Sequence, residues 1–122
     1  MTITNIISNK KINKFYNLQE LGVFDYAFPY CEAIEIIRYL KDEFYYILGG
    51  DVFKINGGKI SYADDSWYCE RKKGETASEY LNRCYKTAFE FIQTRKEIKN
   101  YVYSITFSED ILTDTLYSNT SC

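Results

Sequence analysis

The sequence predicts one α+β domain over residues 1–122, with an antiparallel sheet of about four to five strands and helices packed on one face. Three observations predict this class. The 122 residues are the usual size of a single domain. The apolar fraction of 46%, with 13 Tyr and 8 Phe, suits a folded core and half-buried strands. The spacing of apolar residues changes from helical to strand-like and back, which gives the order helix, helix, strands, helix, strand, with a core at about 12–107.

Helical spacing marks two segments before the strands. Residues 12–21 are expected to form a short helix that ends at Gly22, because glycine adopts the left-handed backbone of a helix C-terminus. A second helix is expected over residues 30–42, directly after Pro29, which fits the first turn of a helix. The apolar residues of this second helix form one stripe: Tyr30, Ala33, Ile34, Ile37 and Leu40.

The middle of the chain is typical of an antiparallel meander. Gly49-Gly50 is expected to break or bulge a strand, and Asn56-Gly57-Gly58 predicts a tight hairpin turn. A further polar turn is expected at Asp64-Asp65-Ser66. Around these breaks, short apolar and aromatic runs are expected to form strands at residues 44–48, 52–55, 59–62 and 67–70.

A long helix and a last strand are expected after the meander. Thr76 and Glu79 have the spacing of a capping box, which predicts a helix from there to about residue 96. The aromatic and apolar alternation over residues 101–107 predicts the last strand. Residues 108–122 are acidic and rich in Ser and Thr, and the sequence does not indicate whether this tail is ordered.

The four cysteines have no spacing that is typical of a zinc site. No secretory signal is evident, and no apolar run approaches the roughly 20 residues that span a membrane. We therefore expect a cytoplasmic chain with free thiols, without metal, cofactor or membrane partner. Cys31 and Cys84 lie in helical patterns and are expected to pack in the core, whereas Cys69 and Cys122 lie outside them.

The sequence argues against the common catalytic sites. It contains no His, which excludes Ser-His and Cys-His nucleophiles, and it has neither a phosphate-binding loop nor a dinucleotide fingerprint. Carboxylates such as Asp51 and Glu70 could form an acid–base pair, but the rim of a hairpin is the simpler interpretation. Asp64 and Asp65 lack the ligand pattern of a calcium loop. We therefore expect that the protein is not an enzyme.

Charge is distributed unevenly along the chain. The net charge of −2 argues against a nucleic-acid partner, which needs a dominant basic field. Residues 25–70 carry nine acids against four bases, whereas residues 71–100 carry eight bases against four acids. An acidic middle segment suits a basic partner, and an ordinary solvated surface is the alternative.

Four stretches between residues 21 and 70 form a specific pattern. They are Leu21-Gly22-Val23-Phe24-Asp25-Tyr26-Ala27-Phe28, Ala33-Ile34-Glu35, Ile47-Leu48-Gly49-Gly50-Asp51-Val52-Phe53 and Asp65-Ser66-Trp67-Tyr68. This pattern resembles that of the immunity protein 40 family of bacterial polymorphic toxin systems, and the resemblance extends over roughly residues 15–107. Tyr26 and Phe53 depart from it, where the family has Trp and Tyr. The resemblance implies a protein that binds and neutralises a toxin made by the same cell or its kin.

The expected contact surface for such a toxin lies on the meander, because tight interfaces combine aromatic anchors with a charged rim. Its acids are expected to face a basic site on the toxin. Trp67 has two interpretations: it is a buried core residue or an exposed hot spot of the interface. Gly49-Gly50 likewise has two: the glycines are needed for the backbone conformation, or they form a backbone surface for a partner. The candidate residues are Asp51, Tyr62, Asp64, Asp65, Trp67, Tyr68 and Glu70.

Two other functions remain open from the sequence. One is a small-ligand or regulatory binding module in a cytoplasmic complex. The other is an enzyme that uses carboxylates.

Overall fold

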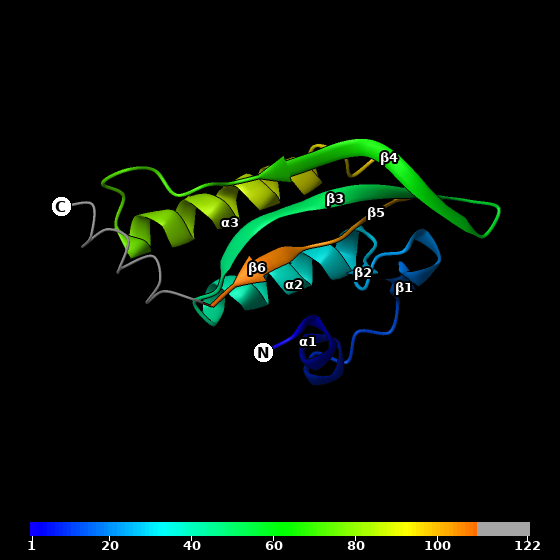
Figure 1. Cartoon of the computed structure of the whole chain (residues 1–122), viewed down its shortest axis with the longest axis horizontal. Helices are drawn as coiled ribbons and strands as arrows, with labels where there is room; N and C mark the ends of the chain where they lie inside the picture. Colours follow the sequence, from blue (N-terminus) through cyan, green and yellow to red (C-terminus); the bar gives the residue numbers. More distant parts are fainter. Residues whose placement is uncertain (110–122) are drawn as a thin grey trace.

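The structure, a computed structural model, describes residues 1–109 (Figure 1). The predicted tail lies outside these residues from residue 110 onward, as does Cys122. The elements in chain order are α1 (Ile3–Asn9), β1 (Tyr16–Asn17), the 3₁₀ turn η1 (Gln19–Leu21), β2 (Tyr26–Ala27), α2 (Tyr30–Asp42), β3 (Tyr46–Asn56), β4 (Lys59–Tyr68), α3 (Ala77–Gln93), β5 (Tyr101–Tyr103) and β6 (Thr106–Ser108). The predicted α+β class is confirmed.

β3 is the centre of the main sheet, and its neighbours all run antiparallel to it. β4 lies on one side, and β5 and β6 follow one another on the other side. Asn56 pairs with Lys59, so Gly57 and Gly58 form a two-residue turn with φ of 56° and 79°. Glycine adopts this left-handed backbone without strain, and the predicted hairpin turn is confirmed. β1 and β2 form a separate antiparallel pair.

The helices α2 and α3 cover one face of the main sheet and lie behind it in Figure 1. α3 begins with the predicted capping box. The Thr76 hydroxyl accepts from the Glu79 N–H at 3.1 Å, and the Glu79 carboxylate accepts from the Thr76 N–H at 2.8 Å. α3 ends at Gln93, earlier than predicted. α2 has the predicted bounds, with Pro29 as its N-cap, and it buries Ala33, Ile34, Ile36, Ile37 and Leu40.

Two hydrophobic clusters lie on opposite faces of the main sheet. Val52 and Tyr103, a cross-strand pair, belong to the larger cluster between the sheet and the helices. The next cross-strand pair, Phe53 and Val102, points to the other face, because side chains alternate along a strand. There the smaller cluster joins the segment of residues 16–27 to the sheet. Its buried members are Leu18, Ala27, Phe53, Ile60 and Val102.

The helix predicted over residues 12–21 is wrong. The chain forms α1 earlier, with the cap at Thr2, and then continues as β1 and η1. The reason is that the apolar residues of this segment pack in two cores, Ile12 in the larger cluster and Leu18 in the smaller one. One helical stripe cannot face both sides of a sheet. Gly22 ends η1 with a left-handed φ of 77°.

The predicted meander is also wrong, because the strands form one long hairpin. Gly49-Gly50 lies inside β3, where the pairing with β6 shifts its register between Ile47 and Gly49, so the bulge expected there is confirmed and the break is not. The polar stretch of residues 64–66 lies inside β4. β4 keeps its pairing with β3 by taking up additional residues between Tyr62 and Asp65. Asp64 has a φ of 54° there. The polar stretch therefore marks a β-bulge, where the chain does not reverse its direction.

The last predicted strand is divided in two. β5 and β6 both pair with β3, and Ser104 lies between them. The Ser104 N–H donates to the Asp51 carbonyl at 3.0 Å, and the Asp51 N–H donates to the Ser104 hydroxyl at 3.1 Å. The hydroxyl thus maintains the contact with β3 across the break.

The two helical cysteines have opposite environments. Cys84 is buried as predicted, and burial raises the pKa of its thiol to about 11. It is therefore protonated at neutral pH and serves as a core residue. The prediction for Cys31 is wrong, because its side chain is exposed. Cys31 lies in the first turn of α2, outside the stripe of residues that this helix buries.

Candidate functional site

Part of the main sheet is uncovered, within residues 1–109, on the face opposite α2 and α3. The smaller cluster covers the hairpin end of this face and leaves its middle accessible. Asp51 lies opposite Ser66, and Gly49 lies opposite Tyr68. Residues that are directly opposite in an antiparallel pair point to the same face. We call this surface the open face; its side chains on β3 and β4 are Asp51, Tyr62, Ser66 and Tyr68.

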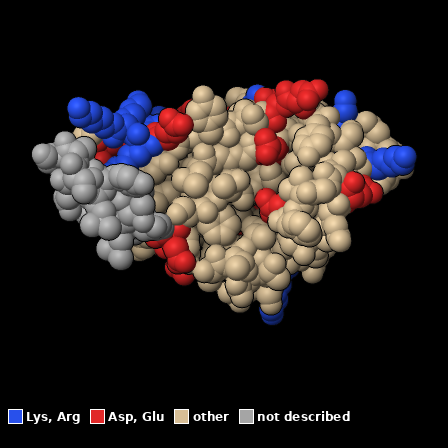
Figure 2. Space-filling model, in the orientation of Figure 1, with Lys and Arg blue, Asp and Glu red and all other residues tan. Residues whose placement is uncertain are grey.

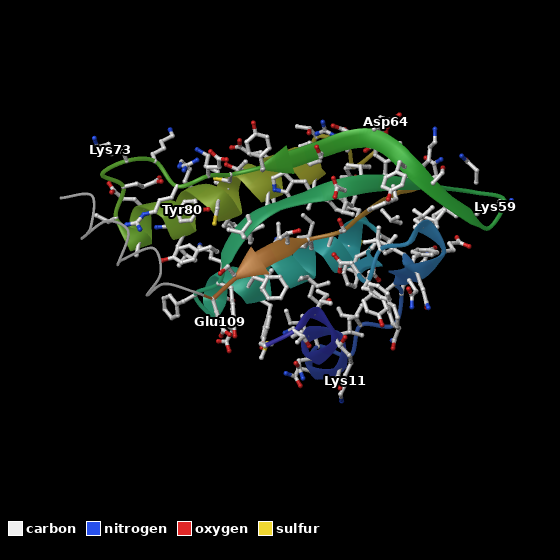
Figure 3. All side chains as sticks on the ribbon, viewed as in Figure 1. Lys11, Lys59, Asp64, Lys73, Tyr80 and Glu109 are labelled. Atoms are coloured by element: carbon white, nitrogen blue, oxygen red, sulfur yellow. The ribbon has the colours of Figure 1, made fainter. Side chains whose placement is uncertain are left out.

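Four of the predicted residues on β3 and β4 are exposed, and Glu70, after β4, is exposed as well. Tyr68 is 75% exposed and Tyr62 is 49% exposed, with its ring 5.2 Å from that of Phe53. Asp51 is exposed in the middle of the open face. Asp64 is exposed in the bulge and lies at the outer edge of the sheet, on β4 (Figure 3). These residues combine aromatic surface with negative charge.

Asp65 and Trp67 point to the opposite face, toward α3. The Trp67 ring is 6% exposed and lies 4.8 Å from the Phe91 ring. The guanidinium of Arg95 lies 3.5 Å from the centre of the Phe91 ring and donates to Asp65 at 2.7 Å. The four side chains form a stack between β4 and α3. The core interpretation of Trp67 is therefore the one that its burial supports.

Gly49 and Gly50 allow the backbone and the Trp67 ring to approach closely. A Cβ atom on Gly50 would overlap the Ser104 carbonyl oxygen and the ring of Trp67. A Cβ atom on Gly49 would overlap the Trp67 carbonyl oxygen. This geometry supports the structural interpretation of both glycines.

Glu70 lies beyond the end of β4, in a loop that Arg83 holds in place. The Arg83 guanidinium donates to both oxygens of Glu75, at 2.6 and 2.9 Å, and also to the Glu70 carbonyl and the Cys69 sulfur. The hydrogen bonds from Arg83 lower the pKa of Glu75 to about 2. Residues 71–73 of this loop are basic, so Glu70, which is exposed, lies next to positive charge along the chain.

Asp25 belongs to the open face, although it was not among the predicted residues. Phe28 bridges to Tyr103, and Tyr103 pairs with Val52. Asp25 directly precedes β2, and its carboxyl lies close enough to Asp51 for the two charges to interact. Burial raises the pKa of Asp25, and the nearby charge of Asp51 raises it further. The two carboxylates are therefore neighbours on one surface.

Phe24 is 95% exposed, next to Asp25 in the chain. Its neighbours Leu21 and Val23 pack against the smaller cluster. The sequence could not distinguish Phe24 from these residues, because all three are apolar members of one short stretch. For the residues on β4, the sequence did contain a usable signal. Side chains alternate between the two faces of a strand, so Trp67 and Tyr68 must point in opposite directions. The expected turn at residues 64–66 interrupted the strand and hid this alternation.

The charge of the molecule varies over this side. Figure 2 shows it in the orientation of Figure 1, with acidic side chains across its middle and Lys and Arg side chains at its periphery. Glu75 and Asp65 are neutralised by Arg83 and Arg95. The acidic segment predicted from the sequence is therefore only partly an acidic surface.

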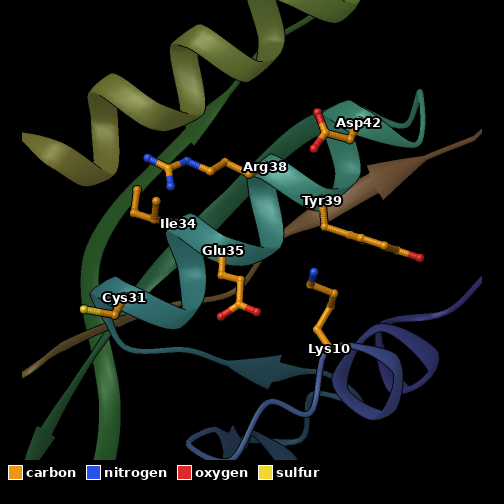
Figure 4. A pocket seen from close by; sticks show the side chains of 7 residues that line it. All are labelled: Lys10, Cys31, Ile34, Glu35, Arg38, Tyr39 and Asp42. Carbon is orange, nitrogen blue, oxygen red and sulfur yellow. The ribbon is translucent and has the colours of Figure 1, made fainter.

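Two shallow depressions lie elsewhere. One, of about 400 Å³, lies between α1 and α2 and is lined by charges of both signs, among them Lys10, Glu35 and Arg38 (Figure 4). The other, of about 240 Å³, lies beside Pro29 and Lys99. Residues of the open face line neither of them.

In the described part of the chain, no group of three or more His, Cys, Asp or Glu side chains could hold a metal ion. No helix there has the length and apolar character needed to cross a bilayer.

Comparison with known proteins identifies the class. The family model of immunity protein 40 matches residues 17–107, which include all of α2, β3, β4, α3 and β5. A match over most of the chain and most of the main sheet makes this an immunity protein by family. The chain belongs to the immunity protein 40 family, and the resemblance seen in the sequence is confirmed. No curated protein matches the chain, and no solved structure matches it.

Proposed function

We propose that this chain binds a cognate toxin of a bacterial polymorphic toxin system in the cytoplasm and neutralises it by covering its working surface, without catalysis or a cofactor. The family match over residues 17–107 carries this proposal. The open face supports it, because exposed tyrosines beside carboxylates are typical of a protein interface with a basic partner.

In this proposal the toxin contacts Asp51, Tyr62 and Tyr68, with Asp64 at the rim. Trp67 and Asp65 act from the other side of the sheet, where they fix β4 against α3. Glu70 contributes from the basic loop, outside the centre of the contact. Tyrosine is suited to such a contact because it buries a large apolar area while its hydroxyl stays hydrogen-bonded.

A binding role fits the open face better than an enzymatic role. Asp25 and Asp51 are two carboxylates in unequal environments, an arrangement that acid–base enzymes also use. They lie on an outward-facing sheet surface, however, and neither lines the depressions beside α2 and Pro29. An enzyme needs a concave site that surrounds its substrate.

The test uses the C-terminal domain of the toxin encoded beside the gene for this chain. Cells that produce this domain are expected to grow only when the chain is produced with it. In vitro, inhibition of the toxin is expected to reach its end point at one equivalent of the chain, because occlusion is stoichiometric. Inhibition by far less than one equivalent would point to an enzyme, and the absence of binding would contradict the proposal.

A further inference from the structure

Asp25 and Asp51 form a like-charged pair that the described part of the chain does not neutralise. Both lie on the open face, and none of the ion pairs among residues 1–109 includes either carboxylate. Partial burial of Asp25 and repulsion from Asp51 both disfavour its ionised form. At neutral pH, this arrangement therefore lowers the stability of the isolated protein.

The negative charge of Asp25 is not required by its local structure. The Asp25 carboxylate accepts a hydrogen bond from the Tyr26 N–H at 2.7 Å, and the amide oxygen of Asn would accept it equally. The Asp25 carbonyl accepts from the Leu18 N–H at 3.0 Å, which involves no side chain. The charge is therefore available to a partner.

Phe24, next to Asp25 in the chain, adds an exposed apolar side chain to this region. The short loop that presents it is held on both sides, by the bond from Leu18 to Asp25 and by a bond from the Gly22 N–H to the Gln19 carbonyl at 2.8 Å. A Phe side chain that is 95% exposed on a fixed loop is available to cover apolar area on a partner. A fixed loop also reduces the entropy lost on binding.

We propose that Asp25 and Asp51 form the seat for one basic side chain of the toxin, an arginine in preference to a lysine, and that Phe24, next to Asp25 in the chain, contacts the toxin as well. This assignment rests on the proposed function and adds the chemistry of the contact. A guanidinium can donate several hydrogen bonds in fixed directions, so that it can bind two carboxylates at once. Its charge also removes the repulsion between the two aspartates, which favours the complex over the isolated chain.

The experiment measures the Kd between variants of the full chain and the purified C-terminal toxin domain, at low and high salt. Phe24→Ala, Asp25→Asn and Asp51→Asn are each expected to weaken binding tenfold or more. The two Asn variants are also expected to reduce the dependence of Kd on salt. Because both carboxylates would contact one cation, the double variant is expected to lose less than the product of the single losses.

Matched controls lie away from the open face. Glu35→Gln removes an exposed acid from the outer face of α2, and Phe44→Ala removes a Phe that is 65% exposed after that helix. Both are expected to bind the toxin within twofold of the wild type. Asp25→Asn is expected to unfold at the same or a higher temperature than the wild type, so its weaker binding cannot come from misfolding.

Several outcomes overturn the seat. If Asp25→Asn and Asp51→Asn bind as tightly as the wild type, the seat is wrong and the proposed function stands. If their binding falls only together with their melting temperature, the two acids are structural and the seat is wrong. A Phe24→Ala variant that loses self-association and keeps toxin binding would assign the surface to a second copy of the chain. If the wild type does not bind the toxin, the proposed function fails and the seat with it.

Discussion

The carboxyl of Asp25 gives a stability prediction whose sign is fixed by the direction of its pKa shift. Its pKa is raised in the folded chain, chiefly by burial, from an ordinary value of 3.8. Between the unfolded and the folded pKa the native state binds more protons, so its stability rises as the pH falls through the folded value. Asp25→Asn is therefore expected to raise the melting temperature at pH 7 and to reduce this pH dependence. Thermal unfolding at pH 7 and pH 4 measures both, and a lower melting temperature at pH 7 would contradict it.

Trp67 gives a second prediction at the scale of the residue. Its ring packs on Phe91, and its indole N–H has no hydrogen-bond partner in the described part of the chain. Trp67→Ala is expected to lower the free energy of unfolding by about 3–5 kcal/mol because it leaves a cavity. Trp67→Phe is expected to cost less, since it loses no hydrogen bond. Denaturant unfolding measures both. Normal stability of Trp67→Ala together with lost neutralisation would instead make Trp67 a hot spot.

The ion pair of Glu75 and Arg83 joins the loop after β4 to α3, and it gives a prediction at the scale of the element. The pKa of Glu75 is lowered from 4.5 to about 2, so the pair stabilises the fold above pH 4.5 and this contribution is lost as the pH falls from there toward 2. Glu75→Gln is expected to lower the free energy of unfolding at pH 7 by about 1.5–3 kcal/mol, the range for hydrogen bonds to charged groups.

Unfolding of Glu75→Gln between pH 7 and pH 2 tests this prediction, with Glu90→Gln as the control. Glu90 is more exposed and lies 3.9 Å from Lys86, so its substitution is expected to change stability little. If the free energy of unfolding falls equally steeply with decreasing pH in Glu75→Gln and in the wild type, the assigned role of the pair is contradicted.

Gly50 tests the close approach of β3 to its neighbours. Gly50→Ala is expected to lower the free energy of unfolding by about 1–3 kcal/mol, because the added methyl would overlap the Ser104 carbonyl oxygen and the Trp67 ring. Gly74→Ala provides a measure of backbone effects alone, since its φ is 81° and nothing lies near its Cβ position. Unchanged stability of Gly50→Ala with lost toxin binding would refute the structural role.

Sequence patterns predicted the elements whose signals are local. The capping box at Thr76 and the turn at Gly57-Gly58 each depend on residues that are adjacent or three apart. The sequence failed where distant contacts decide. Ile12 and Leu18 pack on opposite sides of a sheet that forms later in the chain. Asp64 was expected in a turn because polar residues favour turns, whereas pairing with β3 keeps it inside a strand.

At the scale of the molecule, the sequence predicted the family and the acidic character of the middle segment. It predicted only in part which residues lie together on the open face. Tyr62, Tyr68 and Asp51 were chosen for their residue types and lie together on the open face. Asp65 was chosen for the same reason, but Arg95, thirty residues later, neutralises it. Asp25 could not be predicted to join Asp51, because a strand order that brings residues 25–28 beside β5 is not encoded locally.

The central claim, that the toxin covers the open face, is tested most directly by site-specific photo-crosslinking. A photoreactive phenylalanine analogue is placed at Tyr68 on the open face, or at Tyr39 on α2, which lines the depression away from it. Each variant is irradiated with one equivalent of the purified toxin domain. A covalent complex from position 68 and none from position 39 is the expected result. Crosslinking from position 39 alone, with both variants still neutralising the toxin, would contradict the claim.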